Sequence, residues 1–262
     1  MSSIDRPALI LLHAFPLDHR VWDDVIGCLR ESPRWIERVV LTPDFRGFGA
    51  TPLADSNDAT IPAPSLDVLA DDVLTGLDAA GIERAVVAGV SLGGYVAMAL
   101  LRRAPERIVG LGLVDTKPGP DGVDARANRL RIADDMKAGG NVAALARAML
   151  PGLLGPTTLT ESPELVERVR DWIHGADPLA IAWVQRAMAQ RPDSIQELRD
   201  FTGPATIVWG EDDALAGWLE QDAMAQALQV PVRRIEAVGH LTPVEAPVEV
   251  AAAIQMLLDV AT

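Results

Sequence analysis

Short apolar runs alternate with longer segments of helical periodicity along much of this chain. The near-continuous aliphatic runs lie at residues 8–12, 39–42, 85–90, 108–114, 205–209 and 232–238. Runs that are apolar at consecutive positions are typical of strands buried on both faces, as in a parallel sheet. The pattern therefore predicts a mostly parallel sheet of about six strands.

Helical periodicity fills the segments between these runs. From residue 66 to residue 77 the apolar side chains follow i, i+3, i+4, i+7 spacing, and Ser65 stands where it can cap the first turn. Further helices are predicted over 92–103, before Pro105 prevents continuation, and over 248–258. Alternating strands and helices predict a doubly wound α/β fold with helices on both faces of the sheet.

The alternation is interrupted between residues 120 and 191. Four helical patterns follow one another there, over 125–138, 142–150, 163–174 and 178–190. Ser162 and Asp177 each precede a proline at the first helical position, which marks two of the starts. An all-helical segment between two strands predicts a lid, inserted in a core domain made of residues 1–119 and 192–262.

Composition narrows the class of protein. The 262 residues carry a formal net charge of −14, and so acidic a surface repels phosphate backbones, which argues against a nucleic-acid partner. Cys28 is the one cysteine, so no intrachain disulfide forms. The first apolar run is too short for a signal-peptide core, and no stretch approaches the roughly 18 apolar residues of a membrane helix. We therefore expect a cytoplasmic protein with no membrane partner.

The strongest chemical signal lies where the third apolar run meets the following helix. The stretch Gly89-Val90-Ser91-Leu92-Gly93 matches G-x-S-x-G in the strand–turn–helix context that a nucleophile elbow requires. In such an elbow the serine adopts a strained backbone conformation that exposes its hydroxyl, and the glycines remove Cβ atoms that would clash. Ser91 is therefore the predicted nucleophile, at the positive end of a helix.

A serine hydroxyl needs a base to take its proton, and the chain has four histidines. His13 ends the first run and is expected to shape a loop, His19 lies in a polar stretch, and His174 ends a predicted lid helix. His240 follows the last strand, and catalytic groups of open α/β sheets lie at the carboxyl ends of strands. Elimination and position both favour His240 as the base.

Three acids are candidates for holding the imidazole. Asp212 and Asp213 lie in the turn after the fifth run, and Asp115 ends the strand before the lid. An acid in this role fixes the tautomer of the ring and stabilises the imidazolium. The order Ser91, aspartate of the fifth turn, His240 is the order expected on this scaffold, which favours Asp213 or Asp212 and leaves Asp115 as a further alternative.

Acyl transfer also needs donors for the developing oxyanion. One expected donor is the backbone N–H of Leu92, the residue after the nucleophile. The other is expected from the loop after the first strand, at Phe15, because Pro16 has no N–H to donate.

These motifs together resemble the α/β-hydrolase fold superfamily. Residues 13–16 are similar to its His-Gly oxyanion loop, residues 44–51 to its D-x-R-G-x-G-x-S segment, and residues 239–240 to its histidine loop. Residues 210–213 resemble its G-x-x-D acid turn, which singles out Asp213. Small bacterial carboxylesterases and 3-oxoadipate enol-lactonase-like enzymes look nearest.

The chain departs from the family pattern at two places. Ala14 stands where the family usually has glycine, which narrows the backbone angles open to the oxyanion loop. Seven residues precede the first strand, where family members commonly have a β-hairpin. We therefore expect a sheet that is shortened at this edge.

The resemblance implies a serine hydrolase that cleaves a small carboxylic ester or lactone through an acyl-enzyme. We expect a mostly apolar pocket under the lid. The predicted substrate-binding side chains are Trp22, Met149, Trp172, Trp183, Met188 and Trp218. The charges of the lid nearly balance, which argues against a doubly anionic substrate, whereas Arg126, Arg129 and Arg131 offer a local anion clamp.

Other functions use the same scaffold. The same triad serves C–C bond hydrolysis and cofactor-free perhydrolysis of the haloperoxidase kind, and a hydrolase fold also serves as a non-catalytic ligand sensor. No metal is predicted, because four scattered histidines and one cysteine lack ligand spacing. No G-x-G-x-x-G or P-loop follows a strand, so no cofactor is expected.

Overall fold

One parallel sheet forms the centre of the molecule. The computed structural model describes residues 6–54 and 60–261, and within them the sheet has six strands in the order β2-β1-β3-β4-β5-β6. The strands are β1 (Ala8–Leu12), β2 (Val40–Leu41), β3 (Ala85–Val90), β4 (Ile108–Val114), β5 (Ala205–Gly210) and β6 (Val232–Ile235). All five neighbouring pairs are parallel. The predicted six-stranded α/β fold is confirmed.

The strand order reverses beside β1. The chain passes from β1 to β2 on one side of β1 and then returns to β3 on the other side of β1. The loops that follow the neighbouring strands β1 and β3 therefore lead away in opposite directions. The register pairs Leu12 with Gly89, at the carboxyl ends of both strands. Open α/β sheets bind ligands at such a switch point. The register therefore brings the loop after residue 12 beside Ser91.

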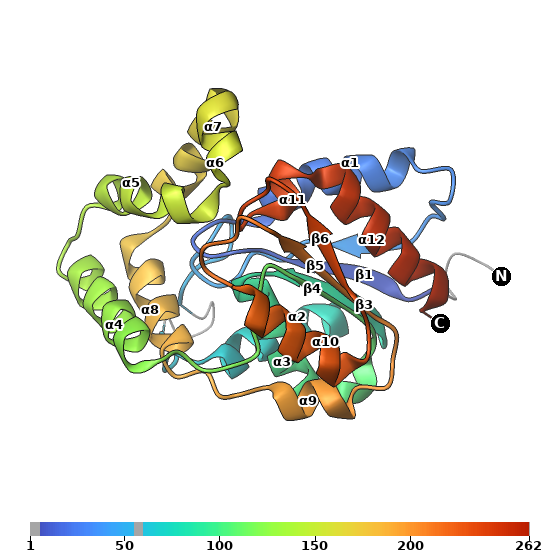
Figure 1. Cartoon of the computed structure of the whole chain (residues 1–262). Helices are drawn as coiled ribbons and strands as arrows, with labels where there is room; N and C mark the ends of the chain where they lie inside the picture. Colours follow the sequence, from blue (N-terminus) through green and yellow to red (C-terminus); the bar gives the residue numbers. More distant parts are fainter. Residues whose placement is uncertain (1–5, 55–59, 262) are drawn as a thin grey trace.

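Helices cover both faces of the sheet, as Figure 1 shows. One face carries α1 (Asp23–Glu31), α11 (Thr242–Glu245) and α12 (Pro247–Val260), and the other carries α2 (Leu66–Ala79), α3 (Leu92–Arg103), α9 (Ile195–Asp200) and α10 (Trp218–Leu228). Two short 3₁₀ helices, η2 (His19–Trp22) and η3 (Pro105–Arg107), complete the core. The sequence pattern predicted α2, α3 and α12, but it did not predict α9, α10 or α11.

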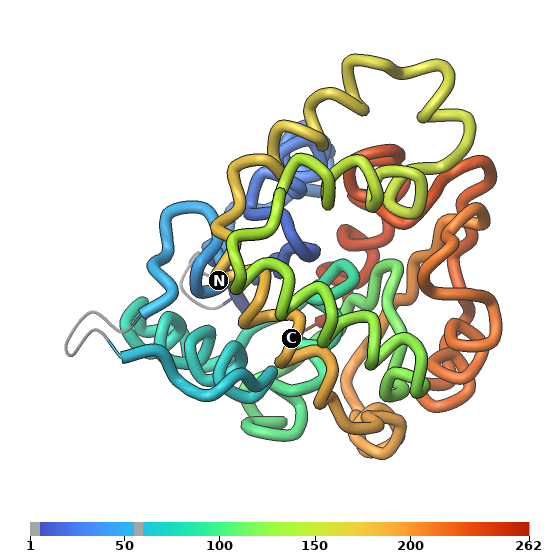
Figure 2. Tube along the Cα trace, turned by 90° about the vertical axis from the view of Figure 1, so that its left-hand side faces the viewer, coloured from blue at the N-terminus to red at the C-terminus, as the bar shows by residue number. Residues whose placement is uncertain are grey.

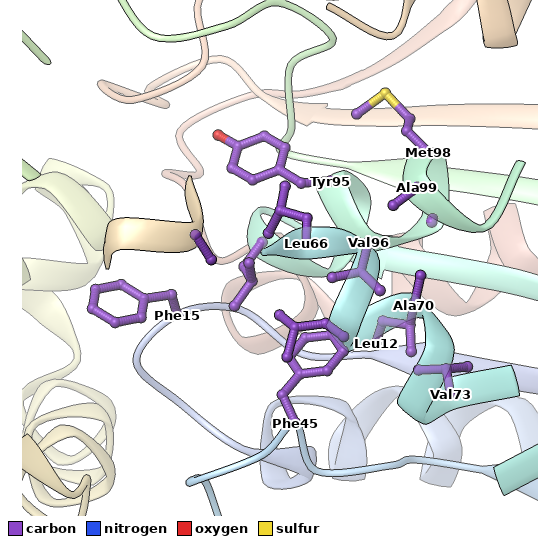
Figure 3. Close-up of a cluster of buried hydrophobic side chains, with 14 of the residues drawn as sticks. Leu12, Phe15, Phe45, Leu66, Ala70, Val73, Tyr95, Val96, Met98 and Ala99 are labelled. Atoms are coloured by element: carbon purple, nitrogen blue, oxygen red, sulfur yellow. The ribbon is translucent and has the colours of Figure 1, made fainter. Parts of the chain in front are cut away.

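Alternate side chains of each strand enter two separate apolar clusters. Ile10 and Leu12 of β1 join the cluster under α2 and α3, whereas Leu9 and Leu11 join the one under α1 and α12. All four are fully buried, as the period of two along a strand requires when both faces are covered. Figure 3 shows part of the first cluster, with Phe15 and Tyr95 at its edge.

Five consecutive helices form an insert between β4 and α9. They are α4 (Val123–Lys137), α5 (Val142–Leu153), α6 (Pro156–Glu161), α7 (Pro163–His174) and α8 (Pro178–Met188). Figures 1 and 2 show this helical insert on one side of the sheet, α4 beside α8 and α5 beside α7. The sequence pattern missed the six-residue α6, and it ended α5 before Pro151, which lies inside that helix.

β6 ends at Ile235 and not at residue 238, because the chain turns there and Ala237 has a positive φ of 59°. Among the described residues no helix has the length and apolarity that crossing a membrane demands.

Candidate active site

Ser91 stands at a sharp turn between β3 and α3. Its φ of 55° and ψ of −112° lie outside the regions that non-glycine residues ordinarily occupy, and its N–H donates to the Val114 carbonyl at 2.9 Å. A Cβ on Gly93 would lie 2.1 Å from the Leu12 carbonyl oxygen, and one on Gly89 would lie 2.2 Å from the Gly93 carbonyl. Glycine at both places therefore lets α3 begin directly against the sheet, with Ser91 at its tip.

Three side chains from distant parts of the chain form a continuous hydrogen-bonded series. His240 Nε2 lies 2.8 Å from Ser91 Oγ, and His240 Nδ1 lies 2.9 Å from each carboxylate oxygen of Asp213. The imidazole is 3% exposed, so water hardly competes for these bonds. Such a series can activate a hydroxyl for attack, with the imidazole taking the proton and the carboxylate orienting the ring.

The turn after β5 directs Asp213 at the imidazole and leaves the preceding residue, Asp212, at the surface. Asp213 is buried, and its Oδ1 also accepts from the amides of Leu215 and Ala216 at 2.7 and 3.0 Å. Asp212 is exposed at the surface. The structure therefore places Asp213, and not the reserve candidate Asp212, behind the ring.

Asp115, the remaining candidate acid, binds backbone and hydroxyl donors. It is fully buried; Oδ1 accepts from the Gly210 amide at 3.0 Å, and Oδ2 accepts from the amide and hydroxyl of Thr242 at 2.9 and 2.7 Å. Burial, together with the charge of Asp213, raises the pKa of Asp115 to about 8. Its contacts hold the acid turn and the histidine loop at the end of β4.

Opposing effects act on the imidazole. Burial disfavours the charged ring of His240, whereas the charge of Asp213 and its hydrogen bond to Nδ1 favour it. The partner prevails, and the pKa of His240 is raised above its ordinary value. A raised pKa strengthens the ring as a base and also raises the pH below which the ring becomes protonated.

Glu245, which the sequence analysis did not single out, joins the histidine loop to the insert. Its Oε1 accepts from the Gly239 amide at 3.0 Å and its Oε2 from the Gly155 amide at 2.8 Å. The backbones approach so closely that a Cβ on Gly239 would lie 2.3 Å from the Gly155 nitrogen. No local sequence motif predicts this contact, because Gly155 and Glu245 lie 90 residues apart in the chain.

The loop after β1 lies beside the nucleophile. Phe15 and Ser91 line the same cavity, and neither the Phe15 nor the Leu92 amide donates a hydrogen bond to another described residue. His13 shapes this loop, as predicted: Nε2 accepts from the Phe45 amide at 2.9 Å, so Nδ1 is the nitrogen that donates to the Ala14 carbonyl. Burial lowers the pKa of His13 to about 4, which keeps the ring neutral.

The polar residues before α1 form a separate cluster. The side chain of His19 is 42% exposed, and its Nδ1 lies 2.8 Å from Asp44 Oδ1. Asp18 offers a further oxygen within 4.8 Å of these two atoms. Arg20, however, binds both oxygens of Asp18 at 2.7 and 2.8 Å. Hydrogen bonds within the protein therefore account for the polar atoms of this cluster.

A cavity of about 330 Å³ lies over Ser91 and His240, under the helical insert. Its apolar wall includes Ile132 of α4 and Met149 of α5, and Met188 of α8 also lines it. Met149 and Met188 are two of the predicted substrate-binding residues. The volume suits a small organic molecule.

The four tryptophans predicted to bind substrate lie outside the cavity lining. Trp22 is fully buried in the cluster under α1 and α12. Trp183 faces the other side of α8, where its Nε1 donates to the Pro62 carbonyl at 2.7 Å. Helical spacing indicates that such residues are buried, but it does not say against which neighbour.

Trp172 and Trp218 contact cations on the surface. The Trp172 ring lies 5.5 and 5.3 Å from the guanidiniums of Arg20 and Arg168. The Trp218 ring lies 3.7 Å from that of Arg234. Arginine side chains cover the faces of both rings, and neither ring belongs to the cavity lining.

Comparison with known proteins assigns the chain to a family. The model of the alpha/beta hydrolase family matches residues 9–253, and the chain belongs to this family. The chain is similar to a thermophilic esterase from Thermogutta terrifontis, solved with malate bound: the two share 33% identity over 98% of this chain and 91% of that one, with a TM-score of 0.85.

Curated relatives extend the comparison. The chain is 24% identical to 3-oxoadipate enol-lactonase 1 of Acinetobacter baylyi over 93% of its own length and 85% of that protein. A stretch of 115 residues, 44% of this chain, is 36% identical to pimeloyl-[acyl-carrier protein] methyl ester esterase of Aromatoleum aromaticum. That stretch spans 39% of the Aromatoleum protein's length.

Proposed function

We propose that this protein hydrolyses a small carboxylic ester or lactone through an acyl-enzyme on Ser91. His240 takes the proton of the hydroxyl as Oγ attacks the carbonyl carbon, and it returns that proton to the leaving alcohol. Asp213 holds the ring and stabilises the imidazolium. The amides of Phe15 and Leu92 bind the oxyanion, and water activated by His240 then releases the acid.

The observation that carries this proposal is the unbroken series from hydroxyl to imidazole to carboxylate, with contacts of 2.8 and 2.9 Å. It opens onto a cavity of about 330 Å³, large enough for a small ester. The chain is a hydrolase of the α/β family, and its relatives include proteins named as esterases and an enol-lactonase. These names favour ester bonds over the C–C and perhydrolase alternatives.

We also propose that residues 120–191 act as a lid on a core domain made of residues 1–119 and 192–262. The support is the cavity lining, which combines Phe15 and His240 of the core with Met149 and Met188 of the insert. A lid that closes over the reacting carbonyl excludes water and strengthens the oxyanion hydrogen bonds.

A stopped-flow experiment with 4-nitrophenyl acetate tests the proposed reaction. We expect a burst of about one equivalent of nitrophenol, followed by steady turnover, and an acetyl group on Ser91 in acid-quenched protein analysed by peptide mass spectrometry. An ester series from acetate to decanoate, with several lactones, then defines the preferred acyl group. Stoichiometric release without turnover supports the ligand-sensor alternative, and acetylation at another residue contradicts the proposal.

The raised pKa of His240 predicts the acidic limb of the pH profile. Catalysis needs the neutral ring, so kcat/KM for a neutral ester should rise with pH and reach half its maximum above pH 6.5, the ordinary value for histidine. His13 does not contribute to this limb, because its pKa of about 4 leaves it neutral throughout. A half-maximum at or below pH 6.5 would contradict the assignment.

A further inference from the structure

The cavity over Ser91 carries positive charge in a strongly acidic protein. The whole chain has a formal net charge of −14, yet Lys117 and Arg129 both line this cavity. Asp121 is the one acidic side chain in the same lining. The wall facing the substrate therefore differs in sign from the molecule as a whole.

Asp121 is shared between two guanidiniums. Its side chain is 1% exposed, and its oxygens pair with Arg129 Nε and, at 2.8 Å, with Arg191 Nη2. One carboxylate cannot neutralise two arginines, so this group of three, in which Asp121 and Arg191 are buried and Arg129 is 20% exposed, has one positive charge in excess. Excess charge away from water is costly unless a counterion joins it.

The two arginines differ in what else they bind. Arg191 lies outside the cavity lining; it donates to the carbonyls of Gly119 and Met188 at 2.9 and 3.4 Å, and it lies 4.4 Å over the ring of Tyr95. These contacts and Asp121 accommodate its charge within the protein. The excess charge therefore faces the cavity through Arg129.

Arg129 directs a weakly bound nitrogen at the cavity lining. Its Nη1 contacts Gln185 Oε1 at 3.2 Å and Met188 Sδ at 3.3 Å, and a thioether is a weak acceptor. Arg131, on the same helix, is instead held outside by Asp135 and Asn128, and Arg126 is exposed. Of the three arginines in α4, the structure thus selects Arg129 as the cavity cation.

Lys117 adds a second cation from the loop after β4. Its Nζ donates to the Leu215 carbonyl at 3.3 Å, which leaves two of its three N–H donors for another acceptor. Burial and the neighbouring Arg191 lower the pKa of Lys117, whereas Asp121 and Glu220 oppose that change. A lysine destabilised in this way gains from a bound anion.

We propose that Arg129 and Lys117 form an anion subsite, so that the preferred substrate is an ester or lactone carrying one carboxylate. The inference rests on the proposed hydrolysis at Ser91. The apolar wall, with Ile132 and Met149, takes the carbon chain between the ester and the carboxylate. Since Asp121 offsets part of the positive charge, the subsite matches a single negative charge better than two.

Matched pairs of esters test the subsite. Mono-4-nitrophenyl succinate, glutarate and adipate are compared with 4-nitrophenyl butyrate, valerate and hexanoate, in which methyl replaces the carboxylate. For a carboxylate on the alcohol side, 4-acetoxybutanoate is compared with butyl acetate. We expect at least one pair in which the anionic ester has the higher kcat/KM, by about 10- to 100-fold, and this preference should shrink with added salt.

Variants assign the preference to residues. Arg129→Gln and Lys117→Gln should each lower the anionic-to-neutral ratio of kcat/KM by about 10-fold or more, while Arg129→Lys should retain part of it. Arg126→Gln, on the exposed side of the same helix, is the matched control and should leave the ratio unchanged. Lys117 forms no ion pair with another described residue, so Lys117→Gln still tests the subsite if an Arg129 variant fails to fold.

The outcomes separate the two proposals. If the wild-type protein hydrolyses the neutral esters through Ser91 but prefers the anionic partner in no pair, the subsite is wrong and the hydrolase proposal stands. The subsite is also wrong if Arg126→Gln changes the ratio as much as Arg129→Gln does. If hydrolysis of the neutral esters persists in Ser91→Ala, the hydrolase proposal itself fails.

Discussion

Replacing Ser91 with alanine is expected to lower kcat for ester hydrolysis by roughly 10⁶-fold. The hydroxyl is the atom that attacks the carbonyl, and no other described side chain hydrogen-bonds to His240 Nε2. Alanine removes one oxygen and keeps the Cβ, so the elbow and its φ of 55° remain possible. The thermal midpoint should therefore change little. Turnover of 4-nitrophenyl acetate and circular dichroism measure the two effects.

Two variants control this experiment. Ser162→Ala, in the insert, removes a hydroxyl that makes no capping bond and should leave kcat unchanged. His240→Ala should lose about as much activity as Ser91→Ala, and the double variant hardly more, because residues that act as a unit are not additive. A Ser91→Ala protein that is folded and retains more than about 1% of wild-type turnover rules out Ser91 as the nucleophile.

Asp213→Asn is expected to lower kcat by about 10⁴-fold. The carboxylate accepts from His240 Nδ1 through both oxygens, at 2.9 Å each. In this variant the side-chain amide oxygen can still accept from the backbone N–H groups of Leu215 and Ala216. That orientation turns the side-chain NH₂ group toward the ring. The NH₂ group favours the tautomer with the proton on Nε2, and that tautomer cannot take the proton of Ser91.

Asp212→Asn is the matched control, because it makes the same substitution one residue earlier on an exposed side chain. It should keep full activity. Asp115→Asn should change the thermal midpoint more than the chemistry, since Asp115 binds Gly210 and Thr242 and not the imidazole. If Asp115→Asn and Asp213→Asn lose equal catalytic activity while both proteins remain folded, the assignment of the orienting role to Asp213 is wrong.

The fold and the placement of Ser91, Asp213 and His240 were predictable because each depends on local pattern. Consecutive apolar residues mark the strands of a covered sheet, and the carboxyl ends of those strands meet along one edge, where Ser91, Asp213 and His240 lie. The turn after β5 left Asp212 and Asp213 open by position alone. The resemblance chose between them, and the geometry agrees.

The pocket was less predictable because it depends on contacts between distant segments. A tryptophan at helical spacing is buried, but the neighbour that buries it is set by packing, and so Trp22 and Trp183 face the core and the loop before α2. The direction in which a charged side chain points is set by packing in the same way. Helix α4 has three arginines within six residues, and only the pairing with Asp121 shows which one faces the cavity. Short helices such as α6 give too few residues for a periodic signal.

The carboxylate of Glu245 couples the position of the helical insert above the cavity to the position of the histidine loop. This one side chain accepts hydrogen bonds from the backbone beside His240 and from the backbone of the α5–α6 turn. A displacement of that turn therefore also displaces the histidine loop. Exchanging the insert for that of a relative would thus alter the alignment of the His240 ring as well as the shape of the cavity. Engineering of specificity in this protein is better directed at single positions of α4, α5 and α8, which leave this tether intact.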